Sequence, residues 1–136
     1  MLKPRALMFV ILLFFVAIPF VHAADHSSLP PDPGEAGKAT LAGIDSDGDG
    51  VRDDVQRWIA TTYPNSEKIR AALRQLAQDY QRFILGNGDA ATIYNAANLM
   101  NNTNNCLSYI DFRQAYSWGQ LLKAKILIPI YDLKHF

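Results

Sequence analysis

The chain has 136 residues, 13 acidic and 13 basic side chains, one cysteine and an apolar fraction of 49%. That length provides for one domain at most. The balanced charge lacks the basic excess typical of nucleic-acid-binding proteins, which excludes that class. The sequence contains no G-x-S-x-G, H-E-x-x-H or P-loop pattern, and we therefore expect no enzymatic activity.

The first 23 residues have the organisation of a secretory signal peptide. Lys3 and Arg5 precede an uncharged apolar run over 6–21, and Ala23 ends a small-residue cleavage pattern. The run is shorter than the roughly 20 residues that span a bilayer comfortably. We predict a signal peptide over 1–23 and a secreted or periplasmic mature chain. An uncleaved anchor is the alternative, and only that segment would then contact the membrane.

Residues 24–43 are rich in proline, glycine and small polar side chains and show no periodicity. This composition predicts a flexible linker. Cys106 stands alone, so the chain cannot form an internal disulfide. Its apolar neighbours Leu107 and Ile110 favour a buried free thiol, with pairing between chains as the alternative.

Apolar residues recur at helical spacing from the middle of the chain to its end. The pattern predicts helices over 53–63, 69–84 and 90–110, with 111–118 continuing as helix and 121–127 forming a last helix or an extended tail. We expect a mainly α fold over 44–136, a small antiparallel bundle of three or four helices.

Particular residues mark the helix ends. Asn65 or Ser66 can cap the second helix, and Asp89 can cap the third. Gly119 offers a place for the last helical segment to break. The asparagine-rich run 101–105 stays in phase with the apolar residues around it, which favours one continuous third helix.

Two other groups of side chains receive ordinary structural interpretations. The basic residues Arg70 and Arg74 lie opposite the apolar stripe, as on a solvated helix face. The aromatic residues on the predicted helices are interpreted as core and interhelix contacts rather than as a sugar-binding platform; they are Tyr80, Phe83, Tyr94, Tyr109, Tyr116 and Trp118.

One acidic segment, 45–56, carries specific chemistry. Its carboxylates alternate at Asp45, Asp47 and Asp49 and are followed by Gly50, the start of a D-x-[DN]-x-[DN]-G calcium loop. Carboxylate oxygens are hard ligands suited to calcium, and the glycine permits the sharp turn. Without an ion, so many neighbouring aspartates would repel one another.

The remaining loop positions complete the predicted ion shell. Val51 would contribute its backbone carbonyl, and Asp53 would act at the ninth position, often through water. Gln56 occupies the twelfth position, where a glutamate would supply two charged oxygens. Gln56 would then bind weakly, Asp54 would substitute for it, or water would fill the shell. Such a site suits the calcium concentrations outside the cell, about 0.1 to 1 mM.

The segment DSDGDGVRDD, from Asp45 to Asp54, resembles the calcium loops of thrombospondin type 3 repeats and the single EF-hand-like loops of exported bacterial proteins. A regulatory EF-hand prefers an apolar residue where this chain has Arg52. The resemblance implies calcium in a stabilising rather than a signalling use. It covers only the loop, and the glycine-rich stretch before the loop provides no entering helix.

We therefore expect an exported calcium-binding helical module with a structural or binding role, in which the ion orders the first helix. The alternative is an accessory or inhibitor subunit that docks on a cell-envelope or extracellular protein through its apolar C-terminal segment.

Overall fold

The computed structural model describes residues 29–86 and 88–132. The predicted signal peptide and the last four residues of the apolar C-terminal segment lie outside these ranges. The elements are a 3-10 helix, η3 (Gly34–Lys38), and the helices α1 (Asp53–Thr62), α2 (Glu67–Leu85), α3 (Ala90–Ile110) and α4 (Phe112–Asp132). The predicted mainly helical fold is confirmed, and no strand occurs within the described residues.

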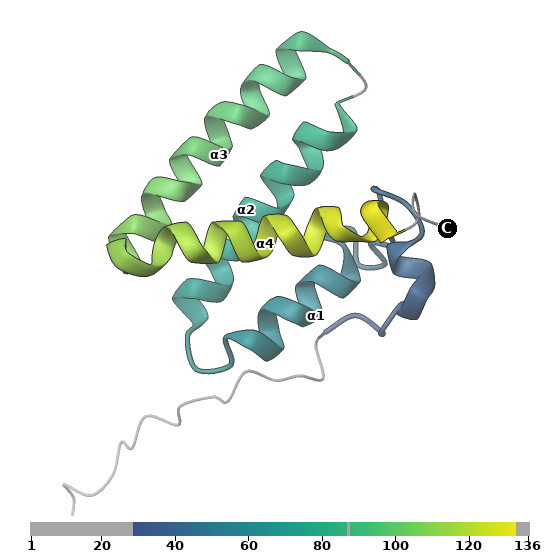
Figure 1. Ribbon diagram of the computed structural model, residues 1–136, viewed down its shortest axis with the longest axis horizontal. Helices are drawn as coiled ribbons and strands as arrows, with labels where there is room; N and C mark the ends of the chain where they lie inside the picture. The colour runs from purple at the N-terminus through teal and green to yellow at the C-terminus, as the bar shows by residue number, and fades with distance from the viewer. Residues whose placement is uncertain (1–28, 87, 133–136) are drawn as a thin grey trace, which may run out of the picture.

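Helices α2 and α3 form an antiparallel hairpin, and α4 crosses it (Figure 1). The hydroxyl of Ser66 caps α2 by accepting from the backbone N–H of Ile69 at 3.3 Å. The carboxylate of Asp89 caps α3 by accepting from the backbone N–H of Thr92 at 2.9 Å. Helix α3 continues through the asparagine-rich run, as predicted. The two caps satisfy backbone donors that a helix start otherwise leaves unpaired.

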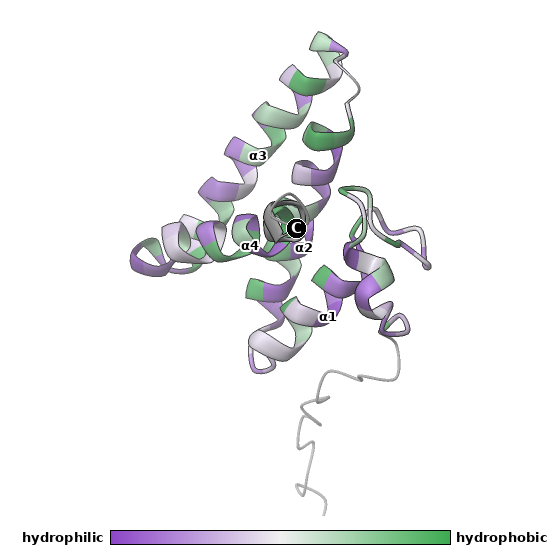
Figure 2. Cartoon of the chain, turned by 45° about the vertical axis from the view of Figure 1, so that its right-hand side comes forward, coloured by the Kyte–Doolittle hydropathy of each residue, from purple (hydrophilic) through white to green (hydrophobic). Residues whose placement is uncertain are grey.

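The core lies where α1, α2 and α4 meet beneath the end of α3. Figure 2 looks almost along α4 and shows it in front of α2, with α1 below. Each helix contributes side chains from one face; the fully buried ones include Val55, Ile59, Leu73, Leu76, Leu107, Leu122 and Ile126. Tyr63 joins Trp58 to Trp118 through two edge-to-face contacts, with ring centroids 6.1 and 6.2 Å apart. Burial raises the pKa of the Tyr63 phenol.

The break between the last two helices falls at Asp111 and not at the predicted Gly119. The backbone N–H of Asp111 closes α3 on the carbonyl of Leu107, and its carboxylate accepts from the N–H of Arg113 at 2.9 Å to start α4. Gly119 is buried inside α4, and a Cβ there would lie 3.5 Å from the Asn104 amide of α3. That is an ordinary van der Waals distance, so the helix passes through this position without a break. The C-terminal segment continues as helix to Asp132.

The segment predicted to be a flexible linker packs against the domain from residue 29 onward. Pro30 is buried, and its carbonyl accepts from the Arg57 guanidinium of α1 at 2.8 Å. Gly37 is also buried, and a Cβ there would lie 2.5 Å from the Pro33 ring. Proline and glycine allow this tight path, and the same composition that predicts a linker here builds a short 3-10 helix.

Several exposure predictions are wrong. The side chains of Tyr94, Tyr109 and Tyr116 are 68%, 96% and 77% exposed, and Phe83 is 40% exposed. Cys106 is exposed rather than buried. Helical spacing shows that side chains share a face but not whether another helix covers it.

Arg70 is buried rather than solvated. Its guanidinium donates to the backbone carbonyls of Tyr63 and Pro64, at 2.9 and 2.6 Å. These two bonds hold the turn between α1 and α2. The apolar stem of Arg70 is buried, while its charged end pairs with carbonyls that follow the end of α1.

One buried polar contact joins α2 to α3. Asp79 is 1% exposed and accepts from the Thr103 hydroxyl at 2.8 Å and from the Arg82 guanidinium at 3.2 Å. The pairing satisfies a carboxylate that would otherwise be costly to bury. Among the described residues, no helix has both the length and the hydropathy needed to cross a membrane.

Thr103→Val should lower the free energy of unfolding by about 2 kcal/mol, because it leaves one oxygen of a buried carboxylate unpaired without changing the side-chain shape. Urea unfolding followed by circular dichroism measures the change. The exposed Thr61→Val is the matched control. Equal losses in the two variants would contradict the assigned role of the Thr103–Asp79 contact.

Candidate metal centre

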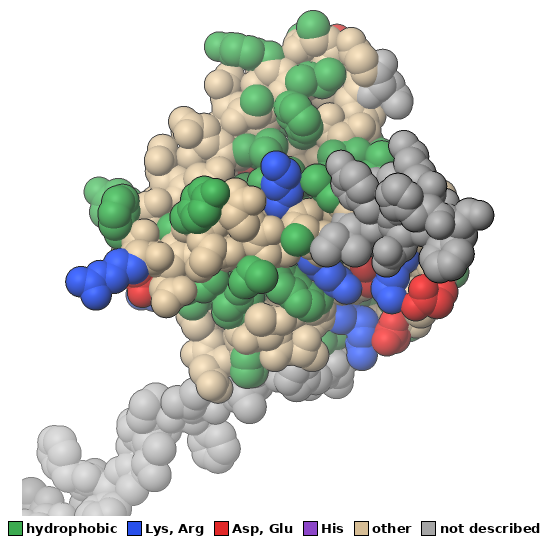
Figure 3. Space-filling model, viewed as in Figure 1, with side chains coloured by type: hydrophobic (Ala, Val, Ile, Leu, Met, Phe, Trp, Pro, Cys, Tyr) green, Lys and Arg blue, Asp and Glu red, His purple; other side chains and the backbone are tan. Residues whose placement is uncertain are grey.

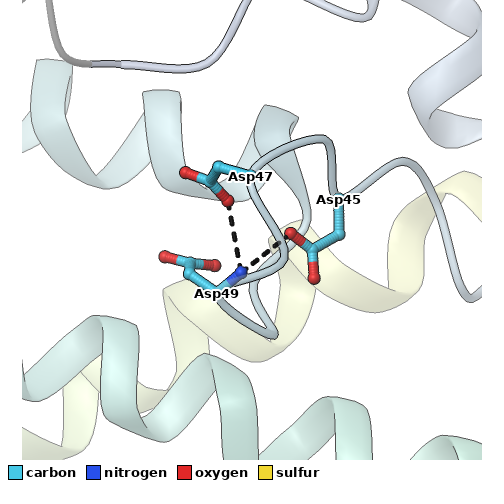
Figure 4. A group of neighbouring side chains, drawn as sticks. All are labelled: Asp45, Asp47 and Asp49. Atoms are coloured by element: carbon cyan, nitrogen blue, oxygen red, sulfur yellow. Dashed lines mark hydrogen bonds between the residues drawn. The ribbon is translucent and has the colours of Figure 1, made fainter.

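Three aspartates converge in the loop before α1. Oxygen atoms of Asp45, Asp47 and Asp49, one from each carboxylate, all lie within 4.8 Å of one another at the surface of the molecule. Figure 4 shows the three side chains around one turn of backbone, with the backbone N–H of Asp49 between the carboxylates of the other two. The structure thus brings together three of the residues that the sequence suggests as ligands. Their spacing is compatible with oxygens that share one cation.

Backbone N–H groups shape the turn. The carboxylate of Asp45 accepts from the N–H of Gly48 at 2.8 Å and of Gly50 at 2.9 Å, and the Asp49 carboxylate accepts from the N–H of Val51 at 2.7 Å. Gly50 has a φ of 83°, in the left-handed region that favours glycine. Each carboxylate has several acceptor positions, so these bonds leave oxygen lone pairs for an ion.

Gln56 closes the turn from α1. Its amide nitrogen donates to Asp47 at 3.2 Å and to Asp49 at 3.0 Å, and the residue is only 9% exposed. Its amide oxygen is buried and has no hydrogen-bond partner. Turning the amide by half a rotation would exchange the two atoms and direct the oxygen at the same two carboxylates. The group can therefore pair with the carboxylates or offer an oxygen to a cation between them.

The other two predicted ligands, Val51 and Asp53, lie in the same segment but have buried side chains. Val51 lies in the loop, with its side chain fully buried in the core. Asp53 is 1% exposed, and its carboxylate accepts from the backbone N–H of Ser46 at 2.9 Å. Asp54 cannot substitute for Gln56 as the structure stands, because both of its oxygens bond to Arg52, at 3.0 Å each.

Arg52 joins the acidic loop to the far end of α4. It is 1% exposed, forms the two-bond pair with Asp54, and donates to the backbone carbonyl of Ile126 at 3.2 Å. Lys125 approaches the same carboxylate at 3.9 Å. Gly43 leaves the space for the arginine, since a Cβ there would lie 2.6 Å from its Nε atom. A planar guanidinium suits this two-bond geometry.

The role of Arg52 was not predicted from the sequence, in which it is only a charged residue in place of an apolar one. That substitution was the available signal, together with an aspartate two positions later. Because Arg52 lies within the acidic loop 45–56, the pair connects the conformation of the loop to the docking of α4.

Two glutamines of α2 support the loop from the other side. Gln78 donates to the backbone carbonyl of Asp49 at 2.6 Å, and Gln81 donates to that of Ala42 at 3.1 Å. Gln78 therefore holds the loop against α2, and Gln81 holds the segment just before it; both glutamines lie outside the acidic motif. These contacts satisfy backbone acceptors that a glycine-rich turn cannot pair internally.

The electrostatics of the turn favour a cation. Partial burial raises the pKa of the Asp49 carboxyl, and the negative charges of Asp47 and Asp45 raise it further. The Val51 N–H and the Arg74 guanidinium act in the opposite direction. Asp49 is thus harder to ionise than a free aspartate, and a cation beside it would reverse that effect.

The chain matches no known family model, no curated protein sequence and no solved structure.

Arg52→Met should lower the free energy of unfolding by about 3 kcal/mol, because it leaves the buried Asp54 with only the more distant Lys125. The double variant Arg52→Met/Asp54→Leu should recover most of the loss, since no buried charge then lacks its partner. Urea unfolding of both variants tests this, with the exposed Lys68→Met as control. A double variant no more stable than Arg52→Met would contradict a tightly coupled pair.

Proposed function

We propose that the loop 45–56 binds calcium and that the ion has a structural role. The ligands are the carboxylates of Asp45, Asp47 and Asp49, the backbone carbonyl of Val51 and the amide oxygen of Gln56, with Asp53 acting from the ninth position. The observation that carries the proposal is the buried Gln56 amide, which contacts Asp47 and Asp49 and has an unpartnered oxygen. The three converging carboxylates would supply the charged oxygens of the same site.

Calcium fits this set of donors better than magnesium does. Calcium accepts six to eight oxygen ligands in a flexible geometry, whereas magnesium requires a tight octahedron and retains several waters. A loop that winds around its ligands and ends on a neutral amide suits the larger ion. With one charged ligand fewer than a glutamate would supply, the affinity should lie near that of extracellular modules, about 0.1 to 1 mM.

The proposed ion would stabilise the start of α1 and, through it, the core. Val51 and Val55 are buried immediately beside the ligands, and Arg52 joins the same segment to α4. At about 1 mM calcium and a dissociation constant near 0.1 mM, ion binding would add roughly 1.4 kcal/mol to the free energy of unfolding. The apolar start of the chain supports an exported protein, which would meet calcium at such concentrations.

About 2 mM calcium should raise the melting temperature of the protein by several degrees, and the same concentration of magnesium should raise it less. Thermal unfolding followed by circular dichroism measures the shift, with excess chelator as the reference. Asp47→Asn/Asp49→Asn should abolish the calcium effect. Asp32→Asn/Glu35→Gln, which removes two exposed acids outside the turn, should preserve it. Equal melting temperatures with calcium and with chelator would refute the proposal.

Gln56→Glu should change stability in opposite directions with and without calcium. In chelator, the new carboxylate lies against Asp47 and Asp49 and should lower the melting temperature by repulsion. In calcium, it supplies two charged oxygens in place of one neutral oxygen and should tighten binding by about tenfold. Calcium titration followed by calorimetry provides the affinity. A variant that is destabilised equally under both conditions would exclude Gln56 from the ion shell.

A further inference from the structure

The corner between α3 and α4 exposes a group of side chains unlike the rest of the surface. We define the aromatic face as Tyr109, Phe112, Arg113, Tyr116 and Lys123. Its three aromatic side chains are 96%, 83% and 77% exposed, in chain order. Figure 3 shows hydrophobic side chains standing out at the left-hand corner, where α3 passes into α4, with a basic side chain beside them. The face therefore combines protruding rings with a hollow between α3 and α4 that Phe112 and Tyr116 line.

The members of this face lie on one side of α4. Phe112, Tyr116 and Lys123 are separated by one turn and then by two, which places them in one row along the helix, with Arg113 next to it. Leu122 lies about 100° around α4 from this row and Trp118 about 140°, so the row borders the buried side of the helix. Tyr109 lies on α3 three residues before Phe112, and Ser108 lines both the hollow beside Phe112 and the one beside Tyr109.

Basic side chains outnumber acidic ones in this region. From Phe112 to Leu127, α4 carries Arg113, Lys123 and Lys125 and no acidic residue, and α3 carries no charged residue at all. The only neighbouring acid is Asp111, whose carboxylate accepts from the N–H groups of Arg113 and Gln114, at 2.9 and 3.2 Å. The exposed side of α4 therefore combines aromatic rings with free basic groups.

We propose that the aromatic face docks on a lipid surface that contains anionic headgroups. Tyrosine and phenylalanine suit the boundary between headgroups and acyl chains, where a ring can be buried while a phenolic hydroxyl stays hydrated. Arginine and lysine beside them bind anionic headgroups. Helices that lie on membranes combine these two features. Rings exposed to this degree can enter a soft interface.

A local probe separates this face from the rest of the chain. The apolar segment 6–21 could itself enter a bilayer, so sedimentation with vesicles would not locate the contact. Cys106 is the only cysteine, so Cys106→Ser/Gln120→Cys places a polarity-sensitive fluorophore on α4 between Tyr116 and Lys123. Cys106→Ser/Gln75→Cys places the same fluorophore on the exposed side of α2 as the control position. Both variants are made in the full chain.

The vesicles contain phosphatidylcholine alone or with about one third phosphatidylglycerol. We expect a blue shift of the fluorophore at position 120 on the anionic vesicles and none at position 75. Phe112→Ser/Tyr116→Ser should weaken the binding read at position 120 by at least about tenfold. Arg113→Gln/Lys123→Gln should weaken it by a similar factor and reduce its dependence on salt.

Tyr94→Ser is the matched control, because Tyr94 is an exposed tyrosine near the other end of α3. It should leave the vesicle signal unchanged, and circular dichroism checks that every variant remains folded. An unshifted probe at position 120, even on protein that sediments with vesicles, would overturn the proposal and leave the face to a protein partner. Equal shifts at positions 75 and 120, or on neutral and anionic vesicles, would overturn it as well.

Discussion

The buried pair between Arg52 and Asp54 is the interaction on which the arrangement of the domain depends. It places a full positive and a full negative charge in the interior within two residues of each other, and the Arg52 guanidinium donates a further hydrogen bond to the Ile126 carbonyl of α4. A buried guanidinium N–H without a partner is costly, so the pair favours the docking of α4. The acidic loop, the first helix and the last helix are thereby joined into one unit, although the loop and the end of α4 are far apart in the sequence.

Helix α4 connects the two surfaces for which functions are proposed. One end rests on the loop that holds the carboxylates, and the other carries the aromatic face (Figure 1). An α-helix rises about 1.5 Å per residue and is stiff over such a length. An ion in the loop and a lipid surface at the corner would therefore act on the same rigid element. The two proposals remain separate, since the loop uses carboxylates and the corner uses aromatic rings and basic groups.

Periodicity predicted the helices because apolar residues recur along the buried faces of α1 and α2. Ser66 and Asp89 predicted helix starts because their short polar side chains can cap them. The sequence could not identify Arg52, Arg70 and Asp79 as buried, since a charged residue enters the interior only when a partner distant in sequence meets it. It also predicted a helix break at Gly119, whereas the break falls at Asp111. In the candidate site, the converging aspartates could be predicted from their spacing, but the contacts of Gln56 and the inward turn of Asp53 required three-dimensional coordinates.

The single residue shared by α3 and α4 makes the chain sensitive to length at that point. Asp111 ends one helix and starts the next, so no spare residue can absorb an insertion. One added residue would rotate the following helix by about 100° relative to the preceding one. That rotation would move Leu122 to the exposed position of Lys123 and bring Gln114, Ser117 and Lys125 into the buried positions of Ala115, Trp118 and Ile126. The rotation of α4 relative to α3 is thus set by the number of residues between them. Homologous chains should therefore differ in length more often at the turn after Gly86 than at Asp111.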